Sequence, residues 1–375
     1  MMVDYLIVGA GFSGCVLAER IATVLGKKCL IVEKRSHIGG NAYDYYNEHG
    51  ILVHKYGPHI FHTNSPKVVE YLSQFTEWNQ YEHKVLANVD GKNIPVPFNL
   101  NSLAQAFPAE KAEHLEKLLL EHFGYGTKIP ILQLRQSTSG ELADLAEFIY
   151  QKIFLHYTKK QWNLEPDELD DAVTARVPVF ISHDNRYFQD DFQGMPSFGY
   201  TELFNKMIGN NPLIDVKLNT DYNDIQGSIQ FKKLIFTGPI DEYFDYKFGA
   251  LPYRSLRFEH ETYNTDYYQE TGTINYPNTY DYTRRTELKY LTSQIHEKTT
   301  CTIEFPQPFI IGENEPYYPI PQTHNNTLYS KYVREAEMIA DSVIFCGRLA
   351  DYKYYNMDQV VARALHIFEK RINLE

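Results

Sequence analysis

The chain has 375 residues, which is long for a single hydrophobic core, so two or three lobes are predicted. Its formal net charge of −12 argues against nucleic acids and anionic membrane surfaces as partners, and no apolar run is long enough to cross a membrane. The four cysteines form no C-x-x-C pair and the N-terminus lacks signal-peptide features, so we predict a cytoplasmic protein with reduced thiols and no metal site.

The first predicted element is a buried strand over residues 4–8, followed by a glycine-rich turn and a helix. A second strand, residues 29–32, ends at an acidic residue where an acid can bind ribose hydroxyls. The glycines fit G-x-G-x-x-G, and the helix N-terminus offers N–H groups to a pyrophosphate. This register predicts a dinucleotide-binding unit, with a ligand-free tight turn as the alternative. The cofactor-binding candidates here are Gly9, Gly11, Phe12, Ser13, Gly14 and Glu33.

A Gly-Gly pair soon after this acidic residue indicates FAD rather than NAD. Gly39 and Gly40 would let the backbone pass close to the cofactor. Lys34, Gly40 and Asn41 are therefore added to the cofactor-binding candidates.

Residues 54–63 contain three histidines, His54, His59 and His62. No carboxylate or cysteine is near them in the sequence, and Gly57-Pro58 would break a helix that aligned them. We therefore predict a loop that lines a flavin, with a histidine near its redox-active ring, rather than a metal site. A simple hydrogen-bonded loop histidine remains the alternative for His54.

The middle of the chain is predicted to be mixed. Residues 85–98 form a hairpin with Asp90-Gly91 at its turn, and residues 103–161 are mainly helical. Trp162 is predicted to be exposed beside a polar loop, as a lid over a planar ligand; a packed core tryptophan is the alternative. Residues 253–305 alternate as antiparallel strands, and a final helix starts near Met357.

A set of motifs spread along the chain closely resembles those of bacterial UDP-galactopyranose mutases. The resemblance runs nearly end to end and is weakest over residues 103–141. The motifs are Gly9-x-Gly11-x-x-Gly14, Glu33-Lys34-Arg35, His37-Ile38-Gly39-Gly40-Asn41, the segment 54–63, Tyr157-Thr158-Lys159-Lys160-Gln161-Trp162, Thr237-Gly238-Pro239-Ile240-Asp241, Phe248-Gly249-Ala250-Leu251, Tyr253-Arg254-Ser255-Leu256, Glu315-Pro316-Tyr317-Tyr318-Pro319 and Gly347-Arg348-Leu349-Ala350.

The resemblance implies an FAD-dependent isomerase that interconverts UDP-galactopyranose and UDP-galactofuranose for cell-surface polysaccharide biosynthesis. In that family N5 of the reduced FAD attacks the anomeric carbon as UDP leaves. The sugar ring then opens and recloses through another hydroxyl, and UDP returns, with no net oxidation. The resemblance also implies NAD(P)H or another reductant for the flavin and a homodimeric assembly.

The resemblance assigns roles to individual residues. Arg176 and Arg284 hold the diphosphate, Arg176 on a mobile loop, and they are counted with His59 as catalytic. Tyr157 stacks on uracil, and Trp162 lies near the sugar. The full set of implied substrate contacts is Tyr157, Thr158, Trp162, Arg176, Tyr187, Asn275, Arg284, Tyr317, Tyr318 and Tyr354.

At the flavin end, the resemblance places a histidine beside the ring system and a C-terminal turn around it. The residues implied are His59, Ile60, His83, Val216, Arg348, Tyr355, Asn356, Met357 and Asp358. One departure matters, because many family members have Asp-Met-His where this chain has Asn356-Met357-Asp358. Any role that requires a negative charge at position 356 is in doubt, and Asp358 could compensate.

The predicted fold class is α/β, a discontinuous Rossmann-type FAD-binding domain with an inserted helical lobe and an antiparallel β-sheet lobe. The FAD-binding domain would comprise residues 1–84, 196–248 and 335–375. The helical lobe would comprise residues 99–165 with a mobile loop to about 178, and the substrate lobe residues 85–98, 179–195 and 249–334.

Three other functions stay open. An FAD-dependent oxidoreductase of the amine-oxidase type shares the N-terminal signature but needs no diphosphate-binding arginines. A non-catalytic nucleotide-sugar or flavin-binding protein would bind UDP without turnover. A mutase acting on UDP-N-acetylgalactosamine would differ only in the pocket around one ring substituent.

Overall fold

The computed structural model describes residues 2–169 and 177–373. The chain forms two compact units. Unit 1 consists of Met1–Gln80, Asp190–Ser255 and Phe309–Glu375, and unit 2 consists of Tyr81–Gln189 and Leu256–Pro308. The helical and sheet lobes that the sequence predicts separately thus share unit 2 for most of their length.

Unit 1 is built on an open parallel sheet with the strand order β12-β2-β1-β13-β19. The first two strands in the sequence lie next to each other, and the later strands extend the sheet on both sides. A ligand binds such a sheet beyond the carboxyl ends of its strands, where the order of connections reverses. The strands are β1 (Met2–Val8), β2 (Cys29–Val32), β12 (Ile214–Lys217), β13 (Gln230–Phe236) and β19 (Val343–Phe345).

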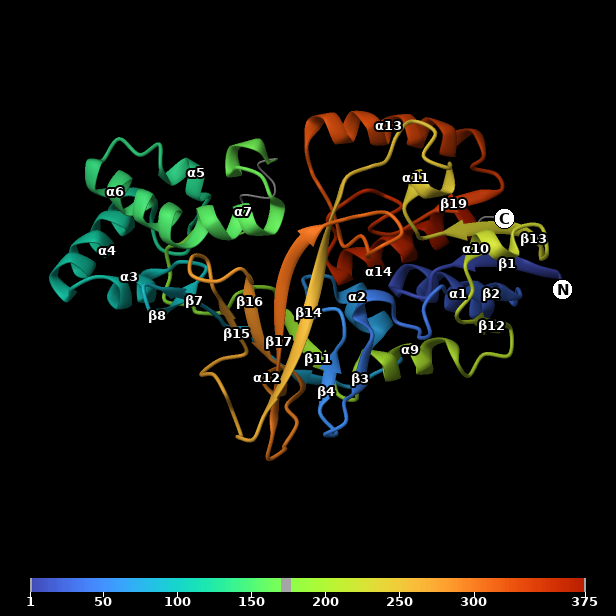
Figure 1. Ribbon diagram of the computed structural model, residues 1–375, viewed down its shortest axis with the longest axis horizontal. Helices are drawn as coiled ribbons and strands as arrows, with labels where there is room; N and C mark the ends of the chain where they lie inside the picture. Colours follow the sequence, from blue (N-terminus) through green and yellow to red (C-terminus); the bar gives the residue numbers. More distant parts are fainter. Residues whose placement is uncertain (1, 170–176, 374–375) are drawn as a thin grey trace. The chain divides into compact units, whose positions relative to one another are not determined.

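Both faces of this sheet are covered, which is why its strands read as continuous apolar runs. Leu6, Leu30 and Leu234 point to one face, where they pack with Tyr332 of α13; Figure 1 shows α13 along one side of the sheet. Helix α1 packs against β1 and β2, and also against α14. The helices of unit 1 are α1 (Phe12–Leu25), η1 (Gly40–Ala42), α2 (Pro66–Leu72), α9 (Tyr200–Ile208), α10 (Tyr222–Ile225), α11 (Ile240–Tyr243), α13 (Thr323–Met338), α14 (Met357–Ile367) and η4 (Phe368–Ile372).

Smaller strand pairings complete unit 1. One sheet has the order β5-β11-β6, a hairpin joins β3 and β4, and β18 pairs with the start of β14. These strands are β3 (Asp44–Tyr46), β4 (Leu52–His54), β5 (Phe61–Thr63), β6 (Trp78–Gln80), β11 (Phe192–Pro196), β14 (Tyr253–Tyr263) and β18 (Tyr318–Pro319).

Unit 2 contains the sheet strands in the order β14-β17-β16-β15-β7-β8. The predicted hairpin is confirmed, because Asp90 and Gly91 both have positive φ and connect β7 to β8. β15 pairs with β16 antiparallel and with β7 parallel. The strands not yet defined are β7 (Val85–Val89), β8 (Lys92–Val96), β15 (Thr273–Asn275), β16 (Arg284–Glu287) and β17 (Thr299–Pro308), with a separate pair β9 (Lys128–Ile129) and β10 (Val179–Phe180).

The helices of unit 2 surround an apolar core that includes Leu115, Leu119, Leu142 and Leu145. Helix α3 contacts both β8 and α4, so the helices and the hairpin form one packed body (Figure 1). Helix α6 continues through the π-helical turn η2 into α7, within the region predicted to be mainly helical. The helices are α3 (Leu100–Ala106), α4 (Ala109–Phe123), α5 (Ile131–Leu134), α6 (Gly140–Ile149), η2 (Tyr150–Leu155), α7 (His156–Trp162), η3 (Pro166–Glu168) and α12 (Leu288–Thr292). Within the described chain, no helix combines the length and apolarity needed to cross a membrane.

Candidate functional site

The turn between β1 and α1 requires its glycines. Gly9 has φ of +99°, and a Cβ there would lie 2.2 Å from Oγ1 of Thr237. A Cβ on Gly14 would lie 2.0 Å from the carbonyl oxygen of Gly9. Gly11 is the N-cap of α1 and supplies no side-chain cap, so the first N–H groups of the helix stay available for an anion. The predicted tight strand-to-helix turn is confirmed, while the binding of a dinucleotide by these residues stays a prediction.

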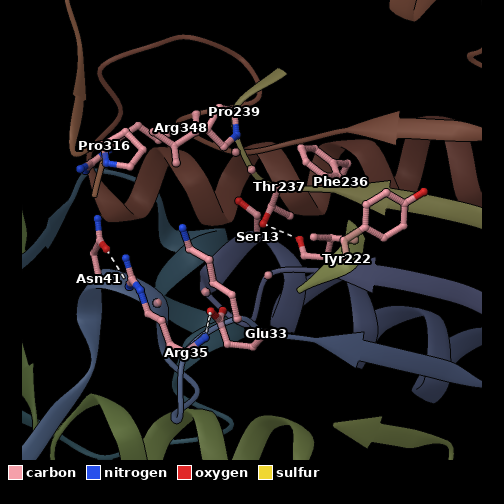
Figure 2. Close-up of a pocket in the computed structure, with 18 of the residues that line it drawn as sticks. Ser13, Glu33, Arg35, Asn41, Tyr222, Phe236, Thr237, Pro239, Pro316 and Arg348 are labelled. Carbon is pink, nitrogen blue, oxygen red and sulfur yellow. Dashed lines mark hydrogen bonds between the residues drawn. The ribbon is translucent and has the colours of Figure 1, made fainter. Parts of the chain in front are cut away.

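Glu33 stands at the end of β2 with its carboxylate fixed in place. The residue is only 7% exposed. Its Oε2 accepts a hydrogen bond from Ala10 N at 2.9 Å, and its Oε1 accepts one from Arg35 N at 3.0 Å. Each carboxylate oxygen can accept one more hydrogen bond, so Glu33 has acceptor sites left for a pair of hydroxyls. Figure 2 shows its carboxylate below Ser13 and Thr237, inside the pocket.

A large pocket in unit 1 extends from this turn. It encloses about 1510 Å³ of space, which includes space open to solvent. Tyr222 and Phe236 lie at one end, and Asn41, Pro316 and Arg348 lie toward the other (Figure 2). The predicted cofactor residues that line it are Gly9, Gly11, Phe12, Ser13, Glu33, Lys34, Gly40, Asn41, His59, Arg348 and Met357.

The remaining predicted cofactor residues do not line this pocket. Tyr355, Asn356 and Asp358 surround the start of α14: Tyr355 O accepts a hydrogen bond from Arg348, Asn356 forms a capping box with Gln359, and Asp358 accepts one from Thr63 Oγ1 at 2.9 Å. Gly14 lies under the glycine turn. Ile60 and Val216 are elsewhere in unit 1, and His83 belongs to unit 2, so contacts of these three with a cofactor stay predictions.

Sequence reasoning missed the part of the pocket supplied by residues that follow β12 and β13. Tyr222 and Asn223 of α10 and Tyr243 of α11 line it, as does Thr237. The signal available was Thr237-Gly238-Pro239, one of the motifs that carry the family resemblance. The residues around Tyr222 carry no local pattern that indicates a ligand.

A charged cluster closes one edge of the pocket. Glu315 Oε2 lies 3.1 Å from Arg35 Nη2 and 3.2 Å from Lys34 Nζ. Arg35 also donates to Asn41 Oδ1 at 3.0 Å and stacks its guanidinium over the ring of Tyr56. Burial acts to raise the pKa of Glu315, but the charges of Arg35 and Lys34 outweigh it and hold that pKa below its ordinary value. We call Lys34, Arg35 and Glu315 the rim cluster.

The three histidines of segment 54–63 have separate partners. His54 Nδ1 accepts from His59 N at 3.1 Å, and His62 Nδ1 lies 2.9 Å from Asp190 Oδ2. His59 Nδ1 lies 2.9 Å from Gly57 O, and burial lowers the pKa of His59 to about 3. His59 is thus a neutral pocket residue. Across residues 2–169 and 177–373, no three His, Cys, Asp or Glu residues are grouped to hold a metal ion.

Unit 2 carries several predicted substrate residues on three elements. Tyr157, Thr158 and Trp162 belong to α7, while Asn275 and Arg284 face each other in the register of β15 and β16. The expectation that Trp162 is exposed is wrong, because it is 6% exposed. Because its indole is packed, Trp162 would contact a sugar as a fixed residue in the wall of a site and not as a mobile lid.

Arg284 has a buried acidic neighbour. Its Nη2 lies 3.3 Å from Oε1 of Glu304, the residue directly opposite it on β17. This pairing fixes one edge of the guanidinium and leaves the side chain partly exposed. The fork geometry of a guanidinium suits phosphate oxygens.

The other predicted substrate residues are distributed over both units. Tyr187 packs against His83 and the core of unit 2. In unit 1, Tyr317 is buried and lines the pocket, and Tyr318 meets Tyr354 edge to face at 4.9 Å. The guanidinium of Arg348 lies over both of these rings. Arg176 lies outside the described residues.

Two sequence-family models and several known proteins match this chain. The sequence model described as "UDP-galactopyranose mutase" matches residues 152–354, and the one described as "NAD(P)-binding Rossmann-like domain" matches residues 7–75. A UDP-galactopyranose mutase of Mycoplasma pneumoniae is 35% identical over 96% of this chain and 94% of its own. A dTDP-fucopyranose mutase of Escherichia coli is also 35% identical, over 96% of each chain.

Solved structures show the same fold. A reduced UDP-galactopyranose mutase superposes with a TM-score of 0.75 at 16% identity, covering 100% of this chain and 96% of that one. A putrescine oxidase superposes with a TM-score of 0.62 at 12% identity, covering 100% and 99%. These two likenesses concern the fold alone.

Proposed function

Because the chain belongs to the UDP-galactopyranose mutase family, we propose that it interconverts UDP-galactopyranose and UDP-galactofuranose. The observation that carries this proposal is the match of the family over 152–354, together with relatives that cover nearly the whole chain. That range includes the α7 residues, Asn275 and Arg284, which the N-terminal dinucleotide signature does not explain.

We propose FAD as the cofactor, bound in the pocket of unit 1. The tight glycine turn beside the pocket supports a dinucleotide, because Gly9 and Gly40 have positive φ and a side chain at either would collide with its neighbours. The N-terminus of α1 would receive the pyrophosphate, and Glu33 would accept the ribose hydroxyls. When reduced, a bound flavin supplies the nucleophilic nitrogen for the anomeric carbon. A reduced nicotinamide or another reductant would deliver its electrons.

Residues of the chain would keep UDP bound to the protein after it leaves the sugar, until it attacks the sugar again. Arg284 would stabilise the leaving diphosphate by charge-assisted hydrogen bonds, together with Arg176. Tyr157 would stack on the uracil. The hydroxyls of Tyr318 and Tyr354 are further candidates for the phosphate oxygens, while neutral His59 would contact the cofactor without adding charge.

A second substrate is supported by one specific comparison. The dTDP-fucopyranose mutase is as similar in sequence as the Mycoplasma enzyme and covers as much of this chain. The overall identity therefore does not separate a UDP-hexose from a dTDP-6-deoxyhexose. We keep dTDP-fucopyranose as the second candidate.

The two candidates are tested in parallel assays under anaerobic conditions. The purified protein, with and without dithionite, receives UDP-galactofuranose, and UDP-galactopyranose is followed by chromatography. We expect conversion only after reduction, with far less than one equivalent of reductant consumed per turnover. No conversion while flavin is bound would overturn the UDP-galactose assignment. Parallel assays with dTDP-fucopyranose and UDP-N-acetylgalactosamine would then identify the sugar.

A further inference from the structure

Lys160 is held by the loop that joins β15 to β16. Its Nζ donates to the carbonyl oxygens of Tyr276, Tyr280 and Tyr282 at 2.6, 2.7 and 3.3 Å. An ammonium group has three N–H donors, so it can satisfy three carbonyls that point to one place. This loop, residues 276–283, is called the tyrosine loop below.

The tyrosine loop is short and its two ends carry predicted substrate residues. Asn275 precedes it, Arg284 follows it, and the two pair across the hairpin. Inside the loop, Tyr276, Tyr280 and Tyr282 pack their rings together at centroid distances of 4.8–5.2 Å. Because Arg284 directly follows this loop, the conformation of the loop sets the position of the Arg284 side chain.

Lys160 belongs to α7, the helix that carries Tyr157 and Trp162. A second contact joins the same helical segment to the same loop, because Asn278 Nδ2 donates a hydrogen bond to Lys152 O at 2.8 Å. Lys152 belongs to η2 and Lys160 to α7, so the loop is bonded to the helical segment at two positions. Burial lowers the pKa of Lys160 to about 8, opposed by Asp281, so the ammonium is mostly charged at neutral pH.

We propose that Lys160 is a positioning residue for nucleotide binding: it fixes the Asn275–Arg284 hairpin against α7, so that Arg284 and Tyr157 keep the spacing that a nucleoside diphosphate requires. This inference rests on the proposed function, which gives Tyr157 and Arg284 their ligand. A solvated surface lysine would not converge on three carbonyls of one loop.

The test compares Lys160→Met with Lys159→Met in the full, flavin-loaded chain. Lys159 is the matched control, because it is next in sequence but its Nζ pairs with Glu165 at 2.7 Å. We expect Lys160→Met to weaken UDP binding about tenfold or more, with flavin content unchanged. Amide hydrogen exchange should rise at Tyr276 and Thr283, whose N–H groups bond to Thr283 O and Glu304 O at 2.9 Å. Lys159→Met should match the wild type in both measurements.

Two further measurements separate positioning from general stability. Lys160 acts through Arg284, so Lys160→Met should cost much less affinity in an Arg284→Ala background than alone. Propylammonium added to Lys160→Ala should restore UDP affinity in part. If Lys160→Met does not fold, Asn278→Ala should show the same effects to a smaller degree.

The outcomes distinguish a failure of the role proposed for Lys160 from a failure of the proposed function. Unchanged UDP affinity and unchanged exchange in Lys160→Met would overturn the role of Lys160, as would fully additive losses with Arg284→Ala. A wild-type protein that does not bind UDP would refute the proposed function instead, and the exchange measurement would still report whether Lys160 holds the loop.

Discussion

Arg284 is the residue on which substrate binding should depend most, because its guanidinium lies on β16 with one edge fixed by Glu304. Replacing it with alanine removes charge-assisted bonds to a diphosphate, which are worth about 2–4 kcal/mol. We expect Arg284→Ala to reduce kcat/KM by roughly 30- to 1,000-fold while flavin absorbance stays unchanged, because the flavin pocket lies in unit 1. Steady-state kinetics and the flavin spectrum of the purified variant check both parts.

Arg257 is the matched control for this substitution. It is an exposed arginine of the same sheet, on β14, and its guanidinium lies over Phe305 rather than beside Asn275. Arg257→Ala should turn over like the wild type. Normal turnover of Arg284→Ala would remove this arginine from the diphosphate site.

His59 should stay neutral through the physiological pH range. Gly57 O can only accept, so His59 Nδ1 carries the proton and Nε2 is left as an acceptor. Burial lowers the pKa of His59 to about 3, against about 6.5 in an unfolded chain. Nitrogen-15 NMR of histidine-labelled protein, assigned with His59→Gln, should show one imidazole that stays protonated at Nδ1 alone from pH 8 to about pH 4.

The same shift has a consequence for stability. The unfolded chain takes up a proton at His59 before the folded protein does, so stability from this group is present above about pH 6.5 and is lost as pH falls toward 3. His59→Gln should therefore lose less stability between pH 6.5 and 4 than the wild type. An imidazole of His59 that titrates near pH 6.5 would contradict both expectations.

At the scale of elements, the rim cluster joins the turn after β2 to the segment that leads into β18. Glu315 bridges Lys34 and Arg35 beside the pocket, so the cofactor can be retained by this closure. The pairs are partly exposed and each is worth at most about 1 kcal/mol. We expect Glu315→Gln to speed flavin release about three- to tenfold, measured as the recovery of free-flavin fluorescence on dilution, and added salt to speed release in the wild type.

Glu337, an exposed residue of α13, provides the control for the loss of one acidic charge in unit 1. Glu337→Gln should release flavin at the wild-type rate. Equal rates for all three proteins would mean that the rim cluster does not hold the cofactor.

Elements with a local signal were predicted well. The strand, turn, helix and second strand from Met2 to Val32 follow from apolar runs and three glycines, and Asp90-Gly91 indicated its hairpin. Trp162 was misjudged because a polar sequence after it suggested exposure, while the packing that buries its indole comes from tertiary contacts that no local pattern records. Lys160 was not singled out either, since its acceptors lie 116 to 122 residues away in the sequence.

At the scale of the whole molecule, the pocket is lined by segments that are far apart in the sequence. Tyr222, Thr237, Tyr317 and Arg348 reach it from four separate segments. The order β12-β2-β1-β13-β19 brings the segments of Tyr222, Thr237 and Arg348 to the carboxyl ends of one sheet, whereas Tyr317 comes from the segment before β18. Periodicity can identify the strands, but their order in space depends on the chain's long crossovers, which is why the glycine turn was predictable and the Tyr222 end was not.

The division into two units makes a prediction for ligand-dependent stability. Every residue that lines the cofactor pocket belongs to unit 1, whereas Tyr157, Asn275 and Arg284 belong to unit 2. Binding stabilises the native state of the part that makes the contacts. Removing the flavin should therefore increase amide hydrogen exchange in β1 and β13, with much smaller changes in β16 and β17. Adding UDP to the flavin-loaded protein should instead slow exchange in α7 and around Arg284.

Mass spectrometry of the apo, flavin-loaded and UDP-bound protein measures all of these segments together. Uniform changes along the whole chain would mean that the two units unfold as one cooperative body, and UDP protection confined to β1 and β13 would mean that the nucleotide binds in the cofactor pocket instead.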